Sequence, residues 1–216
     1  MAQRSILITG CSSGIGLASA RLMKERGWRV LATARNADDI AMLAREVGVT
    51  PLTLDLADPA SIAEAANEAL RITDGRLTAL FNNGAYGQVG AIEDITPDTL
   101  RRQIEVNVIG THDLTRRLIP AMRAQGEGRI VQCSSVLGFV SVPYRGAYCA
   151  SKYALEALGD ALRYELAGTG IHVSIIQPGP IRTRFVATAL ENFRASVDIE
   201  GSAHRETYLR RLAAME

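Results

Sequence analysis

A tyrosine and a lysine four residues apart form the pair with the clearest capacity for chemistry in this sequence. Tyr148 and Lys152 lie within residues 147–166, whose pattern predicts a helix, and side chains four residues apart share one face of a helix. A neighbouring positive charge lowers the pKa of a phenol from its usual value of about 10. The pair therefore predicts a tyrosine that acts as an acid or base near neutral pH. Only two of the 24 lysine and arginine residues are lysines, Lys24 and Lys152, which favours a specific role for Lys152.

The elements that must position this pair alternate along the chain. Short runs that are apolar on both faces are typical of buried parallel strands, and their alternation with helices predicts a single-domain α/β fold with a doubly wound, Rossmann-like parallel sheet. The predicted strands span residues 6–8, 29–34, 51–55, 77–81, 130–133 and 173–176. The predicted helices span residues 17–26, 38–47, 58–72, 96–125 (with a kink at Pro120) and 147–166.

The unusual residues of the sequence gather where the predicted strands end. They are residues 10–16, Arg35, Asp55, residues 82–85, Ser134, Ser135, Pro178 and Gly179. Ligands of doubly wound sheets bind beyond the carboxyl ends of the strands. Because Tyr148 and Lys152 follow the fifth of these ends, one ligand site is predicted at this edge of the sheet.

The first strand leads into a glycine-rich turn and then a helix. Glycines stand at positions 10, 14 and 16, where they permit unusual backbone angles and close approach of a ligand. The first N–H groups of the following helix and its dipole attract an anion. The turn therefore predicts a phosphate cradle, although a glycine-rich turn with a structural role alone is the alternative.

The end of the second strand bears on the choice of cofactor. An acidic residue at this point would bind the ribose 2′-hydroxyl of NAD, but the sequence has Ala34, Arg35 and Asn36. A guanidinium binds a 2′-phosphate well, which favours NADP. In the alternative interpretation Arg35 is a solvated charge, and Asp38 and Asp39 belong to the first turn of the next helix.

Composition narrows the class of protein. The chain has 216 residues, 47% of them hydrophobic, and a formal net charge of +1, which gives no reason to expect a nucleic-acid or anionic-membrane partner. No apolar run approaches the ~20 residues that span a bilayer, and no signal peptide precedes the first strand. We expect a cytoplasmic protein with reduced cysteines and no metal site, because neither cysteines nor histidines have ligand spacing. These residues are Cys11, Cys133, Cys149, His112, His172 and His204.

Together the motifs resemble those of short-chain dehydrogenases/reductases from Ile6 to about Thr183. Residues 9–16 match the family's T-G-x-x-x-G-x-G turn, and Tyr148-x-x-x-Lys152 matches its active-site motif. Further matches are the catalytic serine (Ser135), the helix asparagine (Asn107) and the nicotinamide-side motif (Pro178, Gly179, Ile181 and Thr183). The turn is also similar to that of the branch with hydroxysteroid and retinol dehydrogenases.

The resemblance implies a role for each matched residue. Tyr148 would exchange a proton with a carbonyl or alcohol oxygen while NADP carries the hydride. Lys152 would lower the pKa of Tyr148 and hold the nicotinamide ribose, Ser135 would stabilise charge on the oxygen, and Asn107 would hold a water beside Lys152. Without the resemblance, Ser135 would be interpreted as a capping or turn serine, and Asn107 as a surface residue or a local backbone partner.

The resemblance also implies a cofactor site and an assembly. The residues implied to bind NADP are Gly10, Ser12, Ser13, Gly14, Ile15, Gly16, Arg35, Asp55, Leu56, Asn83, Gly84, Tyr148, Lys152, Pro178, Gly179, Ile181 and Thr183. Asp55 and Leu56 would border the adenine, and Asn83 and Gly84 the adjoining ribose. Homodimers or homotetramers formed through helices are implied as well.

The sequence departs from the family pattern in two places. The family usually has Asn-Asn-Ala-Gly after the fourth strand, whereas residues 82–85 are Asn-Asn-Gly-Ala. Family members also continue into a seventh strand and a last helix, and nothing after Thr183 predicts a buried strand. We therefore divide the domain into an NADP-binding and catalytic core (residues 1–183) and a segment with a substrate lid and a C-terminal helix (residues 184–216, with the helix at 205–215).

Apolar side chains near the predicted site indicate the kind of substrate. Those after Ser135 are Leu137, Phe139, Val140 and Val142, and those at helical spacing in residues 184–202 are Phe185, Val186, Leu190, Phe193 and Val197. The second group forms either a helix packed on the core or a lid over the substrate. With no arginine pair for a carboxylate evident after Ser135, a hydrophobic ketone, aldehyde or alcohol is expected. The main alternative is a non-catalytic NADP-binding regulatory module; a nucleotide-sugar epimerase would need a larger C-terminal domain.

Overall fold

A six-stranded parallel sheet forms the centre of the molecule. The computed structural model describes residues 3–213. The strands lie in the order β3-β2-β1-β4-β5-β6, and each neighbouring pair is parallel. They are β1 (Ser5–Ile8), β2 (Arg29–Ala34), β3 (Thr50–Thr53), β4 (Ala79–Asn82), β5 (Gly128–Cys133) and β6 (Ile171–Ile176). The strand order reverses between β1 and β4, which is the switch point where such sheets bind ligands.

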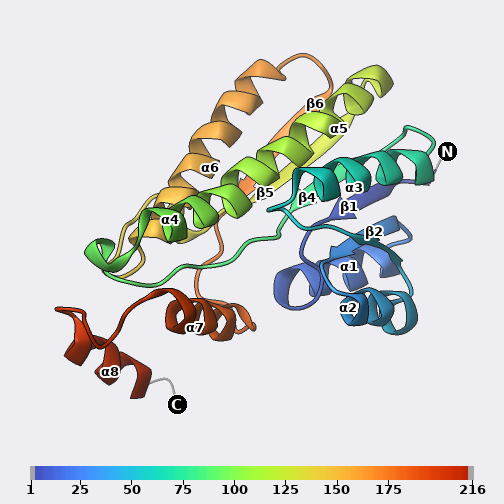
Figure 1. The fold of residues 1–216 in the computed structure, drawn as a ribbon. Helices are drawn as coiled ribbons and strands as arrows, with labels where there is room; N and C mark the ends of the chain where they lie inside the picture. Colours follow the sequence, from blue (N-terminus) through green and yellow to red (C-terminus); the bar gives the residue numbers. More distant parts are fainter. Residues whose placement is uncertain (1–2, 214–216) are drawn as a thin grey trace.

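Helices cover both faces of the sheet (Figure 1). Helices α3, α5 and α6 lie on one face, and α1 and α2 lie on the other. The α-helices are α1 (Gly14–Glu25), α2 (Ala37–Met42), α3 (Pro59–Ile72), α4 (Pro97–Ile104), α5 (Thr111–Gln125), α6 (Gly146–Glu165), α7 (Phe185–Ser196) and α8 (Arg205–Ala213). Shorter helical turns are η1 (Leu43–Val47), η2 (Ile92–Asp94), η3 (Glu105–Gly110) and η4 (Val136–Gly138).

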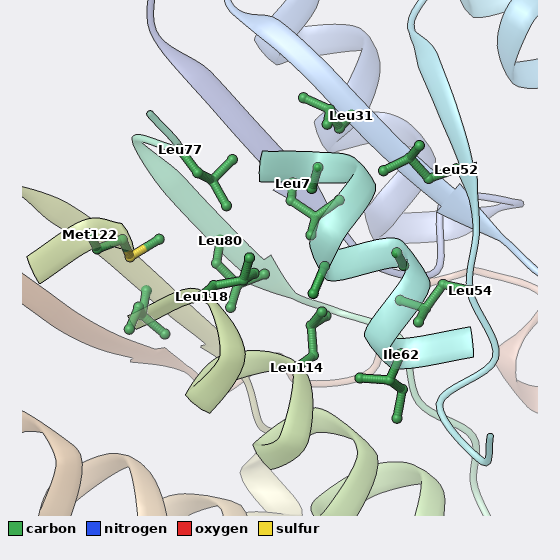
Figure 2. Packing of buried hydrophobic residues seen from close by; sticks show 14 of the residues in the cluster. Leu7, Leu31, Leu52, Leu54, Ile62, Leu77, Leu80, Leu114, Leu118 and Met122 are labelled. Carbon is green, nitrogen blue, oxygen red and sulfur yellow. The ribbon is translucent and has the colours of Figure 1, made fainter. Parts of the chain in front are cut away.

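Alternating strand residues build the two core layers. Leu7 of β1 is fully buried and packs with Ile62 of α3 and Leu114 of α5 (Figure 2). The next residue, Ile8, is equally buried but packs on the opposite face with Ala20 of α1. Successive side chains of a strand point to opposite faces, so the uninterrupted apolar runs of the sequence follow from burial on both sides.

The predicted strands and helices are confirmed, with boundaries that differ by a few residues. The third strand ends at Thr53 rather than Asp55, because the chain turns there and the Asp55 carboxylate accepts a hydrogen bond from the N–H of Ala57 (2.9 Å). The helix predicted to begin at Asp58 is confirmed: Asp58 is its N-cap and accepts from the N–H of Ala60.

The helix predicted over residues 96–125 is interrupted by a π-helical turn. Helix α4 ends at Ile104, η3 covers Glu105–Gly110, and α5 continues with Pro120 in its interior. The long helix is therefore interrupted at η3, a position that the sequence did not indicate, and the kink expected at Pro120 stays a prediction. Gly110 allows the close packing of η3, because a Cβ atom there would lie 1.9 Å from the carbonyl oxygen of Leu56. Such π turns are frequent at functional sites.

The segment after β6 forms two helices that lie together at one end of the molecule (Figure 1). Phe193 of α7 and Tyr208 of α8 are buried against each other, with ring centroids 4.9 Å apart. The prediction of an amphipathic helix in residues 184–202 is thus confirmed as α7. The predicted helix at 205–215 is α8 as far as Ala213, and Met215 lies outside the described residues. No strand follows β6 up to residue 213.

Three properties of the described residues bear on the class of protein. No helix within residues 3–213 is long and apolar enough to cross a membrane. Cys11, Cys133 and Cys149 are buried and form no disulfide. No group of three or more histidine, cysteine, aspartate or glutamate side chains in the described ranges is arranged to hold a metal ion.

Candidate active site

The end of β4 holds the glycine-rich turn between β1 and α1. The Asn83 side-chain amide donates to the carbonyl oxygens of Thr9 (2.9 Å) and Gly10 (3.1 Å). The backbone N–H groups of Asn83 and Gly84 donate to Thr9 Oγ1. Gly10 has a φ of 69°, and a Cβ atom there would lie 2.7 Å from Gly84 Cα, so the turn requires glycine. Asn83 and Gly84, which the resemblance assigned to a ribose, thus also stabilise the glycine-rich turn through hydrogen bonds.

The N-terminus of α1 is suited to hold a phosphate. Its N-cap, Ser13, makes no side-chain capping bond, and its first turn has no acidic residue. Uncapped N–H groups and the helix dipole attract an anion. Gly16 lets the helix pack directly on the turn, because a Cβ atom there would lie 2.3 Å from the Gly10 carbonyl oxygen. The turn, with Ser12, Gly14 and Ile15, therefore fits the pyrophosphate of a dinucleotide.

The end of β2 fits a second phosphate. The Arg35 side chain is exposed and makes no hydrogen bond or ion pair within residues 3–213. Asp39 is tied to Asn36, whose side chain accepts from the Asp39 N–H (2.8 Å) and donates to its carboxylate (2.8 Å). Asp38 and Asp39 lie in the first turn of α2, as the alternative interpretation expected. The guanidinium of Arg35 is thus free to bind an anion such as a 2′-phosphate.

The segment after β3 lies against the end of β4. Asp55 is half-buried, and Leu56 is buried. A Cβ atom on Gly84 would meet Leu56 Cδ1 at 3.2 Å and Thr9 Oγ1 at 3.1 Å. The exchange of alanine and glycine at positions 84 and 85 therefore relieves a tight contact, and neither residue adopts a positive φ.

Tyr148 and Lys152 lie on one face of α6, as their spacing predicts, and both are buried. Their exposed fractions are 7% and 2%. Lys152 Nζ lies 5.7 Å from the centre of the Tyr148 ring and donates a hydrogen bond of 2.7 Å to the carbonyl oxygen of Cys133. Because Cys133 ends β5, this bond fixes the ammonium at the carboxyl edge of the sheet.

The pKa of Tyr148 is raised in this structure, although the neighbouring Lys152 is expected to lower it. Burial raises the pKa of Tyr148 to about 12, and the Ser135 side chain and the charge of Arg145 only partly oppose it. Burial also lowers the pKa of Lys152 to about 8. Loss of solvent disfavours the charged form of each group, and it is the largest cause of both pKa shifts.

Ser135 combines the two roles that the sequence left open. It is buried, and it is the N-cap of η4, with Oγ accepting from the Leu137 N–H (3.1 Å). The same side chain lies near enough to Tyr148 to lower its pKa. The turn thus fixes the serine hydroxyl beside the phenol.

Asn107 lies in the π turn and joins three segments. Its side-chain amide donates to the carbonyl oxygen of Tyr86 (2.9 Å) and to Ser151 Oγ (3.1 Å), and its Oδ1 accepts from the Tyr86 N–H (3.1 Å). Ser151 precedes Lys152 on α6. The asparagine is therefore neither a surface residue nor a local backbone partner, because it is buried and its partners lie 21 and 44 positions away in sequence. It ties η3 to the helix that carries the catalytic candidates.

The nicotinamide-side motif closes the same edge. The carbonyl oxygen of Pro178 accepts from the Val136 N–H (3.2 Å), next to Ser135. Thr183 lies against the glycine turn, where a Cβ atom on Gly14 would meet its Cγ2 at 3.0 Å. Gly179 has open space around it, and Ile181 is 52% exposed. The predicted residues therefore form one continuous rim from α1 to α6.

Two residues near Tyr148 were not among the predicted site residues. The Phe185 ring, at the start of α7, packs edge-on against Tyr148 with centroids 5.5 Å apart. Arg145 stands three residues before Tyr148 on α6, and its charge lowers the pKa of that phenol. The i, i+3 spacing could have identified Arg145, whereas the contact of Phe185 depends on how the chain folds back after β6.

Comparisons with known proteins agree with this geometry. Residues 4–193 match the family described as short chain dehydrogenase. An uncharacterized oxidoreductase of Escherichia coli K12, YbbO, is 52% identical over 183 residues, which cover 85% of this chain and 68% of that protein. Human 17-beta-hydroxysteroid dehydrogenase type 1 is 38% identical over 201 residues, and the match spans 88% of this chain but only 60% of that enzyme.

A solved structure shares the fold. The crystal structure of 3-ketoacyl-(acyl-carrier-protein) reductase from Brucella melitensis, complexed with NADH, has a TM-score of 0.82 at 28% identity. The match covers 88% of this chain and 81% of that one. The chain thus spans about two thirds of its sequence relatives and most of this structural neighbour.

Proposed function

Because the chain belongs to the short-chain dehydrogenase family, we propose that it is an NADP-dependent oxidoreductase that interconverts a hydrophobic ketone or aldehyde and its alcohol. The observation that carries the proposal is that Tyr148 and Ser135 are both buried near the end of β5, with the Ser135 side chain close enough to the phenol to lower its pKa. A binding module has no need for a phenol held beside a hydroxyl in this way.

The cofactor is held by groups that the fold already provides. The uncapped N-terminus of α1 binds the pyrophosphate, and Arg35 binds the 2′-phosphate that distinguishes NADP from NAD. Asp55 and Leu56 border the adenine, and Thr183 lies against the phosphate turn. The remaining cofactor contacts are proposed at Lys152 and along residues 178–181. When bound, the cofactor supplies or accepts the hydride.

The protein's own chemistry is proton transfer and charge stabilisation. In reduction, Tyr148 Oη gives its proton to the carbonyl oxygen as the carbonyl carbon gains a hydride, and the product is an alcohol. A phenol with a pKa of about 12 keeps its proton at neutral pH, as a proton donor must. The Ser135 hydroxyl donates to the same oxygen and stabilises its developing charge. In oxidation Tyr148 Oη accepts the proton of the alcohol oxygen as the carbon gives up a hydride, and Ser135 contacts the same oxygen.

The described residues after Thr183 complete the site as a lid and a C-terminal helix. Phe185 already covers Tyr148, and a Cβ atom on Gly87 would lie 2.8 Å from the Phe185 ring, so α7 fits closely over the catalytic pocket. Such a cover excludes water and strengthens electrostatic interactions beneath it.

We also place the protein in the cytoplasm as a homodimer or homotetramer. The apolar side chains of Ile109 on η3 and of Tyr153 and Leu158 on α6 are exposed, which supports association through these helices.

Replacing Tyr148 by phenylalanine tests the catalytic assignment. NADPH absorbance is followed with a panel of steroid, retinoid and aliphatic ketones and aldehydes. Tyr148→Phe should lower turnover by about 10²- to 10⁴-fold, the contribution of a positioned acid, while the dissociation constant for NADPH changes little. Tyr153→Phe is the matched control, because Tyr153 lies on the same helix and is 43% exposed.

Two outcomes would contradict the proposal. If Tyr148→Phe and Tyr153→Phe retain equal activity, Tyr148 is not the acid. If the wild-type protein binds NADPH tightly but turns over no compound of the panel, the chain is a regulatory NADP-binding module instead.

A further inference from the structure

A hollow beside the catalytic pocket combines an apolar wall with two arginines. It opens to solvent and lies between α7, α8 and the start of α6. Val186, Leu190 and Phe193 of α7 line it, as do Arg145 and Arg211. Its lining is apolar along α7 and cationic at the two guanidiniums.

Arg145 has no counter-charge within the described residues. Its guanidinium makes no hydrogen bond and no ion pair there, although the residue is half-buried. By contrast, some arginines elsewhere on the helices have carboxylate partners, for example Arg117 with Asp113 and Arg163 with Asp160. Burial and the charge of Arg211 both lower the pKa of Arg145. A half-buried guanidinium next to another is costly without an anion.

Arg211 is held in place from the other side. Its guanidinium lies over the ring of Tyr144, 4.3 Å from the centroid. Tyr144 has a φ of 66°, a left-handed conformation that is strained for a bulky residue. Its ring also packs against Tyr208, with centroids 5.8 Å apart. The strained backbone thus turns the ring toward α8, where it orients the guanidinium.

The acidic groups nearest this cluster are engaged elsewhere. Asp94 accepts hydrogen bonds from Tyr208 and Ser202. Glu93 is paired with His204 (2.6 Å). The two arginines therefore remain available to a ligand that brings its own negative charge.

The hollow also adjoins the catalytic phenol. Arg145 is the N-cap of α6, and Tyr148 lies in the first turn of that helix, so that each is within the other's electrostatic field. On α7, Phe185 packs on Tyr148, and the next residue, Val186, lines the hollow. A molecule whose reactive carbon lies at Tyr148 can therefore extend along α7 into the hollow.

We propose that Arg145 and Arg211 bind the far end of the substrate, and that this end carries a carboxylate or a phosphate on an apolar chain. The inference rests on the proposed function and refines it from a hydrophobic carbonyl compound to an amphipathic one. Guanidiniums bind the paired oxygens of both anions, while Leu190 and Phe193 contact the chain.

Direct binding tests the anion site independently of turnover. Isothermal titration calorimetry with octanoate, octyl phosphate and the uncharged octanamide should show about 10- to 100-fold tighter binding of an anion, as expected for a charge-assisted bond. Arg145→Gln and Arg211→Gln should each remove this preference. Arg210→Gln is the matched control, because Arg210 neighbours Arg211 on α8 but does not line the hollow. The two anions distinguish a carboxylate site from a phosphate site.

Kinetics then tests whether this anion belongs to the substrate. A medium-chain ω-oxo acid and its methyl ester are compared, and the ratio of their kcat/KM values should fall about 10- to 100-fold in Arg145→Gln and Arg211→Gln. Equal binding of octanoate and octanamide by the wild-type protein would overturn the anion site. In Arg145→Gln, kcat could instead fall equally for the acid and the ester, with the ratio of their kcat/KM values unchanged. That result would show that Arg145 acts only through its electric field on Tyr148. Anion binding without any turnover would refute the proposed enzyme but not the anion site.

Discussion

The buried ammonium of Lys152 makes a testable contribution to the pH dependence of stability. Its only hydrogen bond given by the described residues goes to the carbonyl oxygen of Cys133, and no carboxylate accepts from it. Burial lowers its pKa from 10.5 to about 8. Lys152→Met keeps a long side chain of similar volume and removes the charge, so the substitution isolates the cost of burying it.

The sign and size follow from proton linkage. Below pH 8 both the folded and the unfolded protein hold the proton, and the charged lysine costs roughly 3 kcal/mol of folding free energy. Between pH 8 and 10.5 the unfolded chain binds a proton that the folded protein has released, so stability rises with pH. From pH 7.0 to 9.5 the wild-type protein should gain about 2 kcal/mol relative to Lys152→Met.

Urea denaturation at a series of pH values measures this difference directly. The lost bond to Cys133 shifts the Lys152→Met curve by a constant amount, so only the slope of the difference with pH is informative. Lys24→Met is the matched control, because it replaces the other lysine of the chain, which is exposed. Wild-type and Lys152→Met stabilities that run parallel from pH 7.0 to 9.5 would refute the argument that burial governs Lys152.

Two further predictions concern the cofactor and the π turn. In a fluorescence titration, Arg35→Gln should weaken NADPH binding about 10- to 100-fold and NADH binding much less, because only NADPH brings the 2′-phosphate. Equal effects on the binding of both cofactors would contradict the assignment to NADP. Asn107→Ala should lower the free energy of unfolding by about 1–3 kcal/mol in urea, because it leaves the Tyr86 N–H without its partner; an unchanged stability would show that water replaces the amide without loss.

The sheet and the site rim could be predicted from sequence because they depend on local signals. Uninterrupted apolar runs identify strands buried on both faces, and glycine spacing identifies a turn that a Cβ atom would block, as at Gly10 and Gly16. Strand ends then converge by topology alone. The π turn at η3 could not be predicted in this way, since it depends on a contact between distant segments, that of Gly110 with Leu56.

Substrate contacts were harder to predict for the same reason. The segment after Ser135 has no arginine pair, and on this basis a purely hydrophobic substrate was expected. Arg145 and Arg211 lie 66 positions apart in sequence, and only the packing of α8 beside the start of α6 brings them to one hollow. Sequence spacing detects pairs within one helix, but pairs formed between helices need the tertiary structure.

The catalytic pair shows where spacing stops being informative about chemistry. The four-residue interval correctly predicted that Tyr148 and Lys152 share a face of α6, but the sign of each pKa shift depends on burial, which spacing does not encode. With the pKa of Tyr148 near 12 and that of Lys152 near 8, the lysine is the group whose proton is more readily released near neutral pH. The phenol therefore stays protonated and can donate, and the burial that makes Lys152 costly for folding is the same burial that keeps the proton on Tyr148 Oη.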